Sequence, residues 1–207
     1  MIDTAFLITG FVTLFVVIDP IGLTPMFIAL TQGNSAQERR RIAIHTCLTS
    51  FAILVVFSLF GEAVLGFIGI SMPAFRVAGG ILLFLTALEM LFERRSKRRE
   101  GQAQEEDELP DPSVFPLAIP LTAGPGSIAT VILLAGQQPG ILGAVTIIGI
   151  VAAVLIVVLS FYLASGILER ALGKTGINVA TRLLGMLLAA LAVQFVLDGL
   201  RDFGFAS

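Results

Sequence analysis

An apolar run near the N-terminus is interrupted by helix-breaking residues, and this interruption constrains the fold more than any other feature of the chain. Residues 5–18 and 26–30 are apolar and together long enough to cross a bilayer, which needs roughly 20 mostly apolar residues. Between them residues 19–25 read Asp-Pro-Ile-Gly-Leu-Thr-Pro. Proline removes a backbone donor and blocks the preceding turn, so we expect two half-helices here. Broken backbone and an acid at membrane depth are typical of a functional site.

Composition indicates an integral membrane protein of the helical kind. Of the 207 residues, 56% are hydrophobic and 14% are charged, against about 25% charged residues in soluble domains. The apolar runs of about 20 residues do not fit the short alternating strands of outer-membrane barrels. A net charge of -2 argues against a nucleic-acid partner. The single Cys47 argues against a cysteine metal site, and we expect no metal, no cofactor and no cleaved signal.

Six apolar spans follow from the pattern, separated by polar segments that include a charged linker at 93–113 and a loop at 169–176. The spans are expected at about residues 2–31, 42–67, 73–92, 114–136, 141–164 and 180–200. The loops after the first, third and fifth spans hold ten of the 13 Lys and Arg residues, and the other two loops hold none. The positive-inside rule then predicts that these three loops are cytoplasmic and that both termini are periplasmic or extracellular.

The chain reads as one all-α transmembrane domain, residues 1–207, made of two similar halves at 1–92 and 114–207. Each half opens with a span broken by Pro and Gly, the second break lying at 121–127. Each half also closes with a span that carries an Arg-x-x-Gly motif. Because each half has three spans, the halves would lie in opposite orientations, an inverted repeat typical of secondary transporters. Chance similarity between two apolar sequences is the alternative.

The two breaks predict a shared polar site near the midplane. Each second half-helix would begin there and present free amides and a positive dipole end, which suit a small anion or carboxylate. Asp19 would face the ammonium of a zwitterion or carry a coupling proton. The simpler alternative is that Asp19 only caps the second half-helix, with Pro20 at its first position. The candidate substrate-binding residues are Asp19, Pro20, Gly22, Thr24, Thr122, Gly124, Pro125, Gly126 and Ser127.

Arg76 and Arg182 are candidate gating or bracing residues. The inverted repeat places Arg76 at the outer end of its span and Arg182 at the inner end. Glu62 is the candidate partner of Arg76. Snorkelling of both arginines to the lipid headgroups is the alternative.

Residues 19–25 and 116–127 resemble the MarC family of integral membrane proteins, also called UPF0056. Residues 75–84 and 193–199 extend the resemblance to essentially the whole chain. It implies a six-span bacterial inner-membrane protein related in fold to the LysE-type amino-acid exporters. It also implies ion-coupled transport of small neutral amino acids such as glycine and alanine, the activity with which an archaeal relative is credited.

We therefore expect a secondary transporter of a small neutral amino acid or similar metabolite, coupled to protons or cations. Efflux of larger drug-like compounds is one alternative, although one Tyr and no Trp do not favour the aromatic-lined cavity it needs. A scaffold or regulatory protein without transport is another. An enzyme is not expected, because the chain has one His, one Cys and no HExxH or GxSxG motif. The expected partners are a small molecule and the bilayer, and a homo-oligomer stays open.

Overall fold

The described part of the chain is mainly helical. The computed structural model describes residues 4–92, 94, 111–138 and 140–205, and these residues form no strand. The elements are α1 (Thr4–Ile18), α2 (Pro20–Leu30), α3 (Ala36–Ile68), α4 (Met72–Leu91), η1 (Ser113–Thr122), α6 (Pro125–Gln137), α7 (Ile141–Leu163) and α8 (Ser165–Phe203). The order matches the predicted spans to within a few residues, apart from the start of α8.

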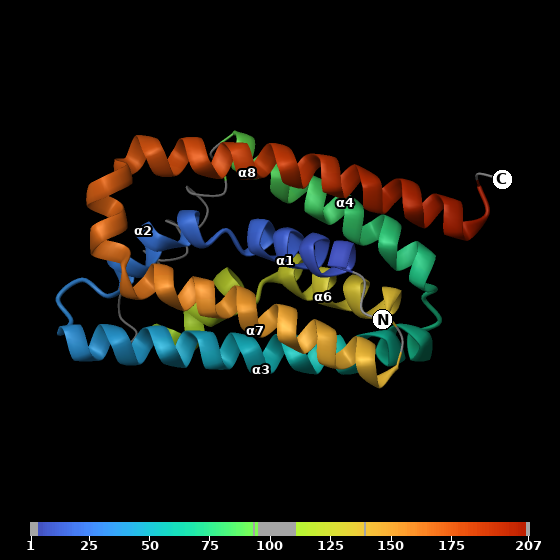
Figure 1. Ribbon diagram of the computed structural model, residues 1–207, viewed down its shortest axis with the longest axis horizontal. Coiled ribbons are helices and arrows are strands. Elements are labelled where there is room, and N and C mark those ends of the chain that lie inside the picture. The colour runs from blue at the N-terminus through green and yellow to red at the C-terminus, as the bar shows by residue number, and fades with distance from the viewer. Residues whose placement is uncertain (1–3, 93, 95–110, 139, 206–207) are drawn as a thin grey trace.

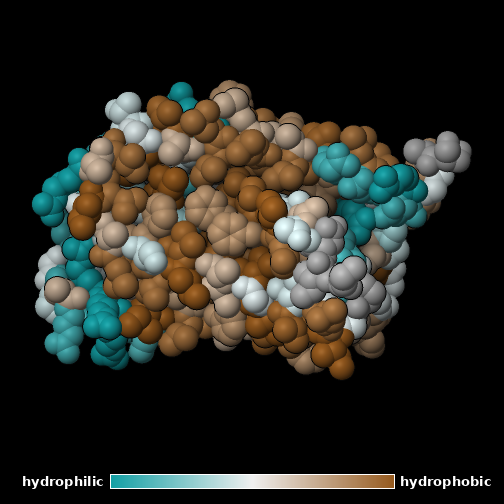
Figure 2. All heavy atoms as spheres, viewed as in Figure 1, coloured by the Kyte–Doolittle hydropathy of each residue, from teal (hydrophilic) through white to brown (hydrophobic). Residues whose placement is uncertain are grey.

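The helices are long and apolar enough for a polytopic membrane protein. Five helical stretches qualify as spans on length and composition, the first being α1 and α2 taken together as Thr4–Leu30. A sixth span results if η1 and α6, which meet at a bend of 58°, are counted as one. On the face that Figure 2 shows, hydrophobic side chains cover the middle of the molecule, whereas hydrophilic ones gather toward the two ends of its long axis. This banding is the surface that a bilayer requires, because the lipid core solvates no polar groups.

The first broken span lies between two helix pairs. Helices α4 and α8 pack along each other on one side, and α3 and α7 pack on the other, with α1 and α6 between them (Figure 1). Leu14 and Ile18 of α1 join a buried cluster with α7, whereas Val16 and Val17 join a second cluster with α4 and α8. The first span is accordingly more deeply buried than the other four. The break at Asp19 therefore lies inside the protein.

Glycines allow the close contact between α4 and α8. A Cβ on Gly80 would lie 2.8 Å from the carbonyl oxygen of Ala192, and a Cβ on Gly199 would lie 3.0 Å from that of Pro73. Gly185 faces the Ala87 carbonyl in the same way, at 3.2 Å. Small residues let the two backbones approach, as in other membrane helix pairs. Gly185 is the glycine of one Arg-x-x-Gly motif, and Gly80 directly follows the glycine of the other.

Serine side chains cap the starts of α3 and α4. Ser35 and Glu38 form a capping box at the start of α3: the Ser35 hydroxyl accepts from the Glu38 amide at 3.3 Å, and the Glu38 carboxylate accepts from the Ser35 amide at 2.8 Å. Ser71 caps α4, with Pro73 in the first turn. Each cap satisfies backbone amides that have no partner inside the helix.

Most of the loop predicted at 169–176 is helical. Helix α8 begins at Ser165, directly after a single turn residue that follows α7, and it consists of two helical stretches that meet at a kink inside this segment. The only interruption is Gly173, whose φ of 59° is open to glycine at little cost. The segment was polar enough to suggest a loop, but Glu, Arg, Ala and Leu are good helix formers. The polar side chains of this segment indicate that the helix is exposed to solvent, not that its backbone is irregular.

The linker predicted at 93–113 lies largely outside the described residues. Its last residues are described, and there the Ser113 amide donates to Oδ1 of Asp111 at 3.0 Å. Interactions with the Ser113 side chain and its backbone amide hold the pKa of Asp111 below its ordinary value. The charged carboxylate of Asp111 thus accepts a hydrogen bond from the first residue of η1.

Candidate functional site

The junction of α1 and α2 is built around the carboxylate of Asp19. Asp19 is fully buried and adopts a left-handed conformation, with φ 59° and ψ 66°. Its Oδ1 accepts from the Gly22 amide at 3.0 Å, and Pro20 takes the first position of α2. Left-handed backbone costs most residues roughly 1–2 kcal/mol, and Asp is among the few that tolerate it. The N-cap expected of Asp19 is therefore present, inside the protein rather than at its surface.

Gly22 and Thr24 serve this junction. A Cβ on Gly22 would overlap with Oδ2 of Asp19, so only glycine leaves room for the carboxylate. The Thr24 hydroxyl is buried and donates to the Pro20 carbonyl at 2.9 Å. In the structure the Gly22 amide holds the carboxylate, and Thr24 bonds to the backbone of α2. A role of both residues in substrate binding stays a prediction.

The second break joins η1 to α6 through extended backbone. Phe115 and Ile119 leave helical geometry, and each precedes a cis proline, Pro116 and Pro120. A Cβ on Gly124 would overlap with the Pro120 carbonyl oxygen, so the backbone of the turn passes too close to Pro120 for any residue but glycine. Gly124 precedes α6 without any side-chain cap. The first amides of α6 are thus left for another acceptor.

Two buried hydroxyls stabilise the second break. The Thr122 hydroxyl donates to the Leu117 carbonyl at 2.8 Å, and the Ser127 hydroxyl donates to the Thr122 carbonyl at 2.9 Å. The Tyr162 hydroxyl of α7 lies 3.1 Å from Oγ1 of Thr122. Since Thr122 already donates its proton to Leu117, Tyr162 is the donor in this second bond. Tyr162 thereby links α7 to the broken span.

The two breaks lie next to each other. α1 contacts α6, and α2 contacts η1. A Cβ on Gly126 would lie 3.1 Å from Cγ1 of Val17, two residues before Asp19. The start of α6 is also where the candidate site opens: Pro125 is exposed and Gly126 is half-buried, whereas the other seven candidates are buried.

Thr181 of α8 is a site residue that the sequence analysis missed. It is buried, and its hydroxyl lies 3.5 Å from Oδ1 of Asp19, a long hydrogen bond. It directly precedes Arg182, the candidate gating residue of this helix, which is exposed. A lone threonine in an apolar span carries no distinctive signal, and only the packing of α8 against α2 brings it to Asp19.

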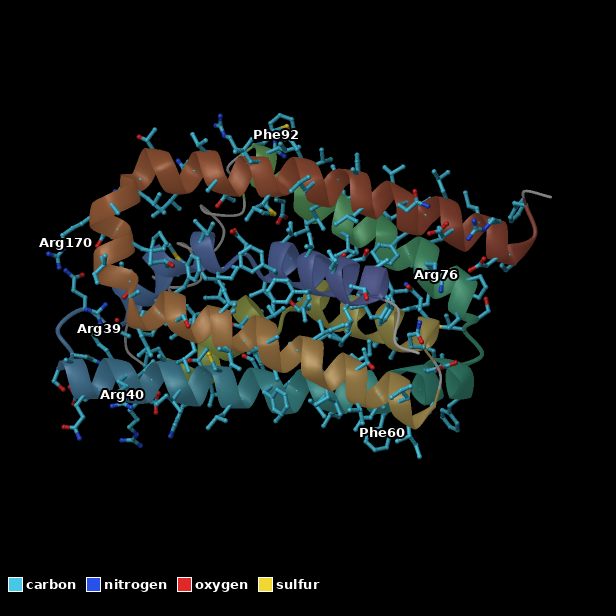
Figure 3. The ribbon with its side chains drawn as sticks, in the orientation of Figure 1. Arg39, Arg40, Phe60, Arg76, Phe92 and Arg170 are labelled. Carbon is cyan, nitrogen blue, oxygen red and sulfur yellow. The ribbon has the colours of Figure 1, made fainter. Side chains whose placement is uncertain are left out.

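Arg76 pairs with Asp202 rather than with Glu62. The Arg76 Nη1 contacts Oδ2 of Asp202, and Arg76 lies apart from the other labelled arginines, near the end of the molecule that holds both chain termini (Figures 1 and 3). Glu62 is exposed. The antiparallel packing of α4 on α8 sets the first turn of α4 beside the last turn of α8. Arg76 therefore braces two helix ends; a gating role for Arg76 or Arg182 stays a prediction.

A cavity of about 310 Å³ opens at the opposite end of the molecule. Arg39, Arg40 and Arg170 line it, and Figure 3 shows all three together at that end, here called the arginine end. Phe27 and Tyr162 also line it, and their rings are stacked with centroids 4.5 Å apart. The same tyrosine that lines this cavity thus also holds Thr122 of the second break. The sequence alone gave no sign of this cavity.

A chain whose described residues form long apolar helices and no strand, with two interrupted spans meeting beside a buried acid, is a polytopic integral membrane protein. The family described as MarC family integral membrane protein matches residues 4–203, and the chain belongs to this family. No solved structure matches the chain. Within the described residues, no group of three or more His, Cys, Asp or Glu side chains is placed to hold a metal ion.

Several curated relatives match nearly end to end. The UPF0056 membrane protein YvbG of Bacillus subtilis is 39% identical over 200 residues, covering 95% of each chain. The UPF0056 inner membrane protein YhgN of Escherichia coli is 35% identical over 197 residues, covering 94% of this chain and 96% of YhgN. A UPF0056 membrane protein of Archaeoglobus fulgidus is 36% identical over 199 residues, covering 96% and 93%. These names state a membrane location and no substrate.

Proposed function

We propose that this protein is a secondary transporter of a small neutral amino acid, such as glycine or alanine, or of a similar small metabolite across the inner membrane. The observation that carries the proposal is the fully buried Asp19 at the junction of two half-helices. A carboxylate inside an apolar bundle is expensive and is retained where it binds a cation or moves a proton. The proposal involves no covalent chemistry.

The chemistry around the breaks suits a zwitterion. Asp19 offers a negative charge for an ammonium group or a proton. The uncapped start of α6 offers a positive dipole end and backbone amides from Gly126 onward for a carboxylate, because Pro125 itself has no amide proton. The amide at Gly22 is already taken by Asp19, so α6 rather than α2 is the proposed carboxylate site. Entry would be at Pro125, the exposed member of the group.

The stacked pair Phe27–Tyr162 is the proposed barrier between this site and the arginine end. The two rings lie 4.5 Å apart at an interplanar angle of 12° and are both buried. Tyr162 is bonded to Thr122 of the second break, so any rearrangement of that break would move one ring of the pair. Alternating access requires such a coupling between the binding site and a closure on one side.

The proposal includes six spans arranged as two inverted halves, 1–92 and 114–207. Each half pairs a broken span with two long helices, and the corresponding elements α3 with α7 and α4 with α8 pack on each other. The arginine end would be cytoplasmic and both termini periplasmic, because the basic residues of the loops concentrate at that end. Cysteine labelling of single surface positions from each side of the membrane tests this orientation.

The transport proposal is tested by counterflow in liposomes loaded with unlabelled amino acids. We expect the purified protein to accumulate labelled glycine or alanine, and Asp19→Asn to reduce the rate roughly tenfold to hundredfold, because a hydrogen bond to a charged group is worth about 1.5–3 kcal/mol. Asn tolerates the left-handed region and caps helices well, so this variant keeps the fold while losing the charge.

A matched control removes a different carboxylate. Asp198→Asn changes an acid on α8 that bonds to Gln194 and Arg201 near the protein surface, and it should transport at the wild-type rate. Unchanged transport by Asp19→Asn at all pH values would contradict the proposed role of Asp19. Counterflow of none of the amino acids would favour the scaffold, and counterflow of larger apolar compounds alone would favour efflux.

A further inference from the structure

The cavity at the arginine end carries a concentrated positive charge. Arg39, Arg40 and Arg170 line it, and none of the described residues that line it is acidic. None of the ion pairs within the described part of the chain involves these three arginines. Three guanidinium groups around one cavity repel one another unless an anion lies between them.

Backbone dipoles add to this charge. The first residues of two helices line the cavity: Ala36 of α3, and Ser165 and Gly166 of α8. Helix α8 begins without a side-chain cap, so its first amides have no acceptor from a side chain. Helix starts carry partial positive charge and bind anions readily. Here they reinforce a site already defined by three arginines.

Two of the three arginines are held in position. The Nη2 of Arg39 donates to the buried Ser165 hydroxyl at 3.1 Å, and its guanidinium lies over the Phe27 ring at 5.8 Å from the centroid. Arg170 is also oriented, because its Nε donates to the Gly166 carbonyl at 3.0 Å. These bonds leave further guanidinium donors of each residue for a ligand. The donors of Arg39 and Arg170 are therefore preorganised.

The cavity also has an apolar wall. The stacked rings of Phe27 and Tyr162 form part of its lining. Its volume of about 310 Å³ is at the lower end for small-molecule sites, which span roughly 300–1,000 Å³, and is more than a bare inorganic ion needs. The lining suits a ligand with a compact anionic group and an apolar or planar part.

We propose that this cavity binds a phosphate group carried by a larger molecule. Three guanidinium groups match a multiply charged anion better than a single carboxylate, and the planar fork of arginine bonds two phosphate oxygens at once. The group belongs either to a soluble phosphate ester or to a phospholipid headgroup. Tyr162 lines the cavity and bonds to Thr122, so an occupant would also contact the residue that holds the second break.

The soluble arm of the test uses phenyl phosphate as the probe. Calorimetric titration of the full chain in a neutral detergent should show saturable binding, while benzyl alcohol, the uncharged analogue, should not bind. The double variant Arg40→Gln/Arg170→Gln should weaken binding at least about tenfold, since two charge-assisted contacts are lost. Arg39 is left in place because it holds Ser165.

Arg41→Gln is the matched control, because Arg41 is exposed on the adjacent position of α3 and does not line the cavity. It should bind phenyl phosphate as the wild type does. Equal binding by the double variant and the wild type would overturn the proposal.

The lipid arm uses nanodiscs of phosphatidylcholine with or without phosphatidylglycerol. Native mass spectrometry should show retained phosphatidylglycerol on the wild type and on Arg41→Gln, and less on the double variant. Retention that depends on the cavity, without binding of phenyl phosphate, assigns the site to a headgroup. Binding of phenyl phosphate without lipid retention assigns it to a soluble ester. Absence of both overturns the proposal, whatever the outcome of the transport assays.

Discussion

The hydroxyl of Tyr162 lies 3.1 Å from Oγ1 of Thr122, while the Tyr162 ring stacks on Phe27. One side chain thus connects the arginine end, the aromatic pair and the second break. Tyr162 is the single tyrosine of the chain and is fully buried, so its polar tip needs the partner that Thr122 supplies.

Tyr162→Phe should separate the hydrogen bond from the stack. The ring and its contact with Phe27 remain, and one buried hydrogen bond is lost, which costs about 0.5–1.5 kcal/mol. We expect a modest fall in the midpoint of thermal unfolding, measured with a thiol-reactive dye on Cys47, the single and buried cysteine. Tyr162→Ala, which also removes the ring, should lower it several times further. Equal effects would contradict the assigned hydrogen bond.

Gly22→Ala should destabilise the first break. The new Cβ would overlap with Oδ2 of Asp19, so either the carboxylate or the start of α2 must move. We expect a loss of thermal stability together with the loss of transport proposed for Asp19 variants. Gly149→Ala on α7 is the control, because nothing lies within 4 Å of its Cβ position. It should stabilise by up to about 1 kcal/mol, since alanine is the better helix former. The same sign for both would refute the steric argument.

The ion pair Arg76–Asp202 should contribute little to stability, but Arg76 should couple to Asp202 and not to Glu62. Its side chains are 15% and 38% exposed, and pairs of this kind are worth about 0–1 kcal/mol. A double-mutant cycle with Arg76→Ala and Asp202→Ala should give a coupling free energy in that range. The same cycle with Arg76 and Glu62 should give none. Coupling to Glu62 instead would mean that α4 and α8 are arranged differently.

The lowered pKa of Asp111 predicts that the stability of the protein depends on pH. Its folded pKa is lowered by its interactions with Ser113, so its contribution to stability is fully present above the unfolded pKa and is lost as pH falls through the folded pKa. The stability advantage of the wild type over Asp111→Asn should be constant near neutral pH and should shrink only in the acid range. Thermal midpoints in detergent at stepped pH measure it. An advantage that grew on acidification would contradict the lowered pKa.

Much of the architecture follows directly from the sequence. Long apolar runs predict spanning helices, because a bilayer forces backbone hydrogen bonds to close within the helix. The caps at Ser35 and Ser71 can be recognised in the sequence, because a cap depends only on neighbouring residues. The start of α8 could not be predicted from the sequence, because a polar helix and a polar loop share the same composition.

The chain itself determined that Asp19 caps a half-helix, since Asp before Pro is a local signal with a local partner at Gly22. Only the tertiary structure decided that the acid is fully buried, that Thr181 reaches it and that Asp202 rather than Glu62 meets Arg76. The same holds for Arg39, which lies more than a hundred residues from Tyr162 and Arg170 in the sequence and which packing brings to the same cavity. The physical reason is that caps and turns depend on residues a few positions apart, whereas sites between helices depend on which faces the helices bury.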